Sequence, residues 1–129
     1  MKKRYKIIII VVLVFIVIGI AGKIIIDQME ENLEYLMSIE INDIDLSSVE
    51  DGTYTGTYKA TPIMVEVEVV VVNHIITNIT ILEHTSGRGD GAEVIVEDVI
   101  DQQSLDVDLI AGASYSSKVI LLAILDALS

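Results

Sequence analysis

The chain has 129 residues, of which 20 are acidic, eight are basic and none is cysteine. Because it carries no thiol, disulfide frameworks, iron–sulfur clusters and cysteine nucleophiles are excluded. All 20 acidic residues lie from Asp27 onward, together with only three basic residues, which gives this part a formal charge of −17. Such a surface repels nucleic acid and favours cationic partners, so we exclude nucleic-acid binding.

The N-terminal 26 residues are set apart by their composition. Four basic residues lie within the first six positions, and residues 7–26 are apolar apart from Lys23 and three small residues. Twenty helical residues span roughly 30 Å, the thickness of the hydrocarbon core of a bilayer. Residues 1–26 therefore predict a single-pass signal-anchor that contacts membrane lipid through residues 7–26. The positive flank indicates a cytoplasmic N-terminus and an extracytoplasmic C-terminal domain at the cell membrane.

A cleaved signal peptide is the alternative for this segment, since its basic and apolar regions also fit one. The small-residue cleavage site is poor, because Ile20 precedes Ala21 and Gly22. Residues 27–50 follow as an acidic tether. Their first apolar residues recur at helical spacing, so the helix is expected to continue for a few turns; the remainder loses this period and predicts a solvated spacer.

Residues 51–129 predict one folded domain that begins with strands. A turn at residues 51–56 leads into a strand that ends at Ala60, and a long strand follows over residues 63–72. Asn73 and His74 predict a tight hairpin turn, because Asn tolerates left-handed backbone angles. The returning strand covers residues 75–82, and strict alternation places one set of side chains on a single face: Ile75, Thr77, Ile79 and Ile81.

Two helices are expected after the strands. Residues 92–103 are amphipathic, with apolar side chains on one side and carboxylates on the other, and residues 118–128 are apolar nearly all round. The fold class is therefore α+β: an N-terminal transmembrane helix plus a small antiparallel sheet packed with two helices.

The segment from Asp108 to Ser117 has small residues in its middle and hydroxyls at its end, just before a helix. The first turn of a helix offers unpaired N–H groups and a favourable dipole to a phosphate. Gly112 and Ala113 would let a ligand approach the backbone closely. The ordinary alternative is that the serines are only N-caps and that the small residues only pack.

This segment resembles the flavinylation motif of the FMN-binding domain family, which is an Asp followed by a small residue, Gly, Ala and then Thr or Ser. The family includes flavin-carrying subunits of sodium-translocating quinone reductases and related membrane complexes, in which a flavin transferase esterifies FMN through its phosphate to the last motif residue. The resemblance makes Asp108 the motif Asp and Ser114 the attachment residue. Ala111 stands where the family usually has Ser or Thr, and Ser114 where Thr is most usual.

Two further stretches carry the resemblance, which covers residues 51–128. The family's domain opens with Asp-Gly-x-Tyr-x-Gly, as residues 51–56 do, and continues through a hairpin to a segment containing His. Here that segment is the glycine-rich loop of residues 83–91, whose ordinary interpretation is a flexible connection. The resemblance places this loop beside the flavin, with His84 and Thr85 as candidates for contacting the isoalloxazine; otherwise His84 is a solvated residue at a strand end.

The candidate cofactor-binding residues are thus His84, Thr85, Asp108, Ala111, Gly112, Ala113, Ser114, Ser116 and Ser117. We expect a membrane-anchored extracytoplasmic flavoprotein that relays electrons through FMN linked covalently to Ser114. Its expected partners are a flavin transferase for maturation and a membrane redox partner. No Ser-His-Asp set or paired His ligands can be placed, so an electron carrier is favoured over a self-sufficient enzyme. The alternatives are a domain that binds FMN noncovalently and a flavin-free acidic interaction module on the cell surface.

Overall fold

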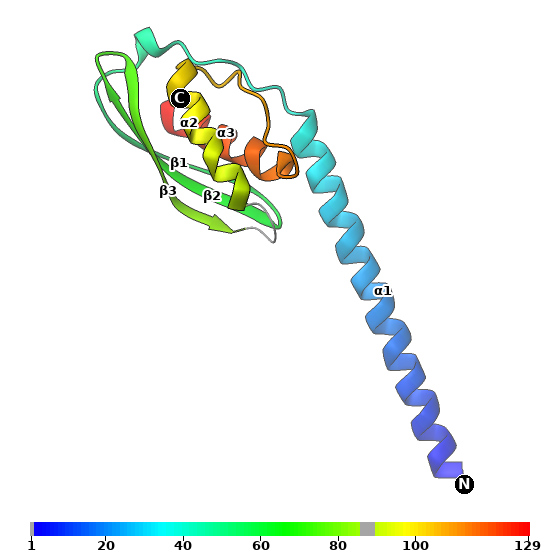
Figure 1. Cartoon of the computed structure of the whole chain (residues 1–129). Helices are drawn as coiled ribbons and strands as arrows, with labels where there is room; N and C mark the ends of the chain where they lie inside the picture. The colour runs from blue at the N-terminus through cyan, green and yellow to red at the C-terminus, as the bar shows by residue number, and fades with distance from the viewer. Residues whose placement is uncertain (1, 86–89) are drawn as a thin grey trace. The chain divides into compact units, whose positions relative to one another are not determined.

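The computed structural model describes residues 2–85 and 90–129. The chain divides into two compact units, Met1–Asn32 and Leu33–Ser129. The described residues form a long apolar helix, a three-stranded antiparallel sheet and further helices (Figure 1), which confirms the α+β prediction.

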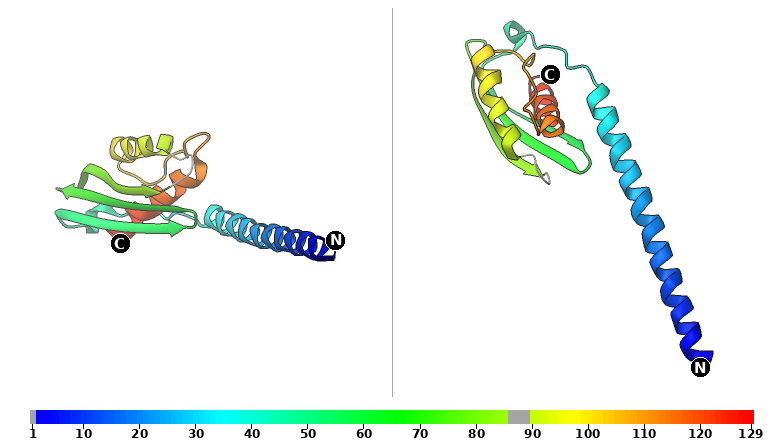
Figure 2. Two further views of the ribbon diagram at one scale, coloured as in Figure 1. Left: turned by 90° about the horizontal axis from the view of Figure 1, so that it is seen from below. Right: turned by 45° about the vertical axis from the view of Figure 1, so that its right-hand side comes forward.

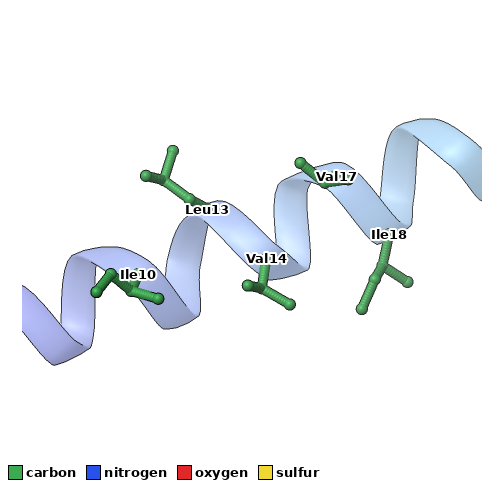
Figure 3. A pocket seen from close by; sticks show the side chains of 5 residues that line it. All are labelled: Ile10, Leu13, Val14, Val17 and Ile18. Carbon is green, nitrogen blue, oxygen red and sulfur yellow. The ribbon is translucent and has the colours of Figure 1, made fainter.

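Helix α1 (Lys2–Ser38) contains the predicted apolar segment. Its most apolar window of 18 residues has a mean hydropathy of 3.1, and none of that window is buried in protein. Figure 3 shows the branched aliphatic side chains that project from it at Ile10, Leu13, Val14, Val17 and Ile18. This helix has the length and composition of a membrane span, which a signal sequence shares.

The sheet has the order β1-β2-β3, with β1 at Gly52–Ala60, β2 at Ile63–Val72 and β3 at Ile75–Thr85. Alternate side chains of β2 are buried from Ile63 to Val71, as the pleat of a half-covered sheet requires. Asn73 and His74 have φ angles of 53° and 63°. Left-handed angles at both central residues match the twist of the flanking strands, so the predicted hairpin turn is confirmed.

Strand β3 does not alternate strictly, and the predicted face is wrong in part. Ile76 and Ile79 are buried, whereas Ile75 and Thr77 are exposed. The pairing of β2 with β3 shifts register twice, between Val70 and Val71 and again between Glu66 and Val67. Each shift inserts one extra residue in β3, and an extra residue reverses which face the following side chains occupy.

Helices α2 (Ile95–Gln102) and α3 (Ser114–Leu128) cover the buried face of the sheet. A short 3-10 helix, η2 (Asp90–Val94), leads into α2, which lies over β3, while α3 crosses β1 and β2 (Figure 2). Strand β1 approaches α3 at Gly56, where a Cβ atom would lie 2.1 Å from the Ala123 carbonyl oxygen. The Asp126 carboxylate then accepts a hydrogen bond from the Thr57 N–H at 2.9 Å.

Residues 39–50, here called the strap, pack against the domain. Leu36, at the end of α1, and Val49 are buried in its core, and a short 3-10 helix, η1 (Leu46–Ser48), lies between them in the chain. Asp43 accepts hydrogen bonds from the Ser104 hydroxyl at 2.7 Å and the Leu105 N–H at 3.0 Å. The expectation of a solvated spacer is therefore wrong for the strap, because its apolar residues complete the core.

Candidate functional site

The segment before α3 folds into a tight turn. The Ala113 N–H donates to the Ile110 carbonyl at 2.9 Å, and Gly112 has a φ of +79°. A left-handed angle at the third residue of a four-residue turn is the reason for glycine at this position. A Cβ atom on Gly112 would meet nothing within 4 Å, and Ala111 and Gly112 are exposed. The turn therefore presents open backbone that a bulky group can approach.

Ser114 is the first residue of α3 and is half-buried. The N-cap is Ala113, and it makes no side-chain capping bond. Within the described part of the chain, the Ser114 hydroxyl forms no hydrogen bond to protein. The ordinary interpretation of this serine as an N-cap is therefore wrong, because it is the first residue of the helical turn whose N–H groups the helix leaves unpaired.

The other two serines of the segment point elsewhere. Ser116 and Ser117 are buried, with exposed fractions of 3% and 0%. The Ser117 hydroxyl donates to the Ala113 carbonyl at 2.7 Å and accepts from the Ile110 N–H at 3.0 Å. Ser117 thus supports the turn from inside, a role that its type alone does not reveal. Asp108 is exposed, on the approach to the turn.

His84 lies near the end of β3 with its side chain only 4% exposed. Its Nδ1 is 3.8 Å from the Glu93 carboxylate, and among the described residues neither ring nitrogen has a hydrogen-bond partner. The interpretation of His84 as a solvated strand-end residue is therefore wrong. Thr85 follows in the strand and is exposed. Residues 86–89 of the predicted glycine-rich loop lie outside the described residues.

The topology carries His84 and Ser114 to the same end of the domain. Val65, near the start of β2, pairs with Tyr58 near the end of β1 and with His84 near the end of β3. His84 therefore lies at the end of the sheet where β1 and β3 finish and β2 begins. Gly56 faces residues 123 and 127 of α3, and Leu128 lies beside Tyr54 at the start of β1. Helix α3 therefore runs antiparallel to β1 and begins toward the end of the domain at which β3 ends (Figure 1).

One cation lies close to the turn. Lys118 is half-buried and is the only basic residue of the sequence beyond Arg88. It follows Ser114 by four residues, and residues four apart lie on the same face of a helix. Lys118 and the helix dipole thus offer positive charge beside Ser114 in a strongly acidic domain.

A second candidate for a ligand site lies away from Ser114. A hollow of about 530 Å³ is lined by residues from η1, β1 and the end of α3: Ser48, Val49, Glu50, Tyr54, Leu128 and Ser129. It lies at the opposite end of α3 from Ser114, about 20 Å away at 1.5 Å per residue. The described residues contain no group of three or more His, Asp or Glu that could hold a metal ion.

Comparison with protein-family models shows the family of the chain. A family model described as the FMN-binding domain matches residues 59–129, which is more than half of the chain and includes His84, the turn and Ser114. The Asp-Gly-x-Tyr-x-Gly stretch lies just before the matched range. No curated protein matches the chain.

Proposed function

The chain belongs to the FMN-binding domain family, with FMN as its cofactor, and from this we propose that it carries FMN as a phosphoester on Ser114. The observation that carries the proposal is the position of this serine. Its free hydroxyl follows an open glycine turn at the first position of α3, where a phosphate is favoured by the dipole and by unpaired N–H groups.

The residues of the turn fit a phosphoester. The backbone is exposed at Gly112, so the group attached at Ser114 has room, and Lys118 stands on the same helical face to balance the charge that a phosphodiester keeps. Ser116 and Ser117 are buried, and the Ser117 hydroxyl is bonded to the Ile110 N–H and the Ala113 carbonyl. We therefore assign contact with the phosphate to the turn, Ser114 and Lys118, and support of the turn to Ser117.

Ester formation needs an activated flavin nucleotide, since a free phosphate would have to expel water. The flavin adenine dinucleotide supplies the required phosphoanhydride. The Ser114 oxygen forms a bond to the FMN phosphorus, the bond from that phosphorus to the bridging oxygen breaks, and AMP leaves with the electron pair. The hydroxyl proton passes to a base of the transferase.

FMN supplies one- and two-electron chemistry when it is bound. The chain's own contribution is to hold and shield the cofactor. The His84 side chain is buried at the same end of the domain, and neither ring nitrogen has a hydrogen-bond partner among the described residues, which suits a donor to a flavin heteroatom. We assign to the protein the relay of electrons between a membrane redox partner and an acceptor, outside the cytoplasm, with α1 as its anchor.

Flavin fluorescence in a denaturing gel tests this proposal and separates it from its alternatives. The protein is purified from membranes of cells that make the flavin transferase. A fluorescent band at its mass supports the ester, while flavin released on denaturation indicates noncovalent FMN. A Ser114→Ala variant is expected to give no band. Native protein without any flavin would leave only an acidic interaction module.

A further inference from the structure

The Ser117 side chain links the turn before Ser114 to α3 by hydrogen bonds. The inference drawn from it below rests on the proposed attachment of FMN at Ser114. Its hydroxyl makes two hydrogen bonds across the turn, accepting from the Ile110 N–H and donating to the Ala113 carbonyl. Its backbone N–H also donates to Ala113, at 2.9 Å. The side chain is completely buried, so these bonds are shielded from water.

These bonds fix the peptide group immediately before Ser114. The Ala113 N–H donates to the Ile110 carbonyl, and the Ala113 carbonyl accepts from Ser117, so both backbone polar groups of Ala113 are hydrogen-bonded. The carbonyl belongs to the peptide plane that joins Ala113 to Ser114. Its orientation sets the direction of the Cα–Cβ bond of Ser114 and hence the position of the reacting oxygen.

We propose that Ser117 is a positioning residue for flavinylation: it orients the Ala113–Ser114 peptide so that the Ser114 oxygen faces the transferase. The reaction needs this oxygen in line with the phosphorus–oxygen bond that breaks. A displacement of about 1 Å costs up to a hundredfold in rate. Loss of the Ser117 hydroxyl also leaves the Ile110 N–H without its partner, which loosens the turn.

The test compares Ser117→Ala with Val119→Ala in the full-length chain in detergent. Val119 is completely buried in α3 outside the turn, so its truncation lowers stability through a cavity and leaves the turn intact. Flavinylation is followed by intact mass with purified transferase and flavin adenine dinucleotide, at a temperature at which both variants are folded. We expect Ser117→Ala to lower kcat ten- to a hundredfold with unchanged KM, Val119→Ala to keep the parent rate, and Ser117→Thr to restore most of it.

A second readout needs no flavin. Hydrogen exchange of the Ile110 amide, normalised to amides in the middle of α3, is expected to be at least tenfold faster in Ser117→Ala than in Val119→Ala. Equal exchange in the two variants, or equal kcat, would overturn the positioning role. If the parent chain takes up no flavin while the exchange difference is present, the attachment proposal fails and the structural role of Ser117 stands. Gly112→Ala perturbs the same turn through its φ of +79° and should slow flavinylation as well.

Discussion

Replacing Gly56 with alanine tests how the domain holds α3 in place. The new Cβ atom would lie 2.1 Å from the Ala123 carbonyl oxygen and 2.4 Å from the Ala127 nitrogen. The distance to the Ala123 oxygen is about 1 Å shorter than the closest normal approach of a carbon and an oxygen atom, about 3.3 Å. Both neighbours are backbone atoms, so no side-chain rotation relieves the overlap and α3 must move as a unit.

We expect Gly56→Ala to lower the free energy of unfolding by about 3–5 kcal/mol, above the usual range for overpacking because rigid backbone is displaced. A domain of this size has only about 5–15 kcal/mol in total. Denaturant unfolding of the full-length chain in detergent, followed by circular dichroism of the sheet, gives the value. Gly91→Ala is the matched control, since a Cβ there meets nothing within 4 Å. A loss below 1 kcal/mol for Gly56→Ala would refute the close packing of β1 on α3.

Three further predictions concern the strap, an edge of the sheet and the attachment site. Hydrogen bonds from the Ser104 hydroxyl and the Leu105 N–H hold the pKa of Asp43 below its usual value. They therefore stabilise the strap at neutral pH and are lost as the pH falls through that lowered pKa. We expect cleavage of the strap by protease to increase between pH 7 and pH 3 in the parent chain and to stay constant in Asp43→Asn. Gln103 makes three hydrogen bonds to backbone groups, so Gln103→Ala should cost about 2 kcal/mol in denaturant unfolding. Lys118→Gln should slow flavinylation of Ser114 several-fold, whereas Lys59→Gln, at an exposed lysine of β1, should not.

Helices, strands and turns of the domain could be predicted where residues close together in the sequence determine them. The Asn73–His74 turn follows from the tolerance of Asn for left-handed angles. Helix α2 follows from apolar periodicity, because burial of one helical face leaves a regular pattern, and α3 follows from a run that is apolar nearly all round, as a buried helix requires. The face of β3 could not be predicted, since the extra residue at Thr77 that moves Ile76 into the core depends on pairing with β2 and leaves no local pattern.

The residues of the proposed attachment site are identified from a resemblance in the sequence. The residues of the turn and Ser114 occur in one continuous motif, so they could be assigned together. The roles proposed for Ser117 and Lys118 could not, because one depends on a bond to Ile110 and the other on where α3 begins. The packing of Leu36, at the end of α1, and of the strap could not be predicted either, since Leu36 and Val49 are buried by contacts with distant parts of the chain.

The most direct test of the central claim is the mass of the peptide of residues 89–118 from protein purified out of its native membrane. Trypsin releases this peptide by cutting after Arg88 and Lys118. We predict a mass raised by FMN less one water, with fragment ions that place the addition on Ser114. A peptide of unmodified mass, from cells in which the flavin transferase modifies its other substrates, would contradict the covalent attachment.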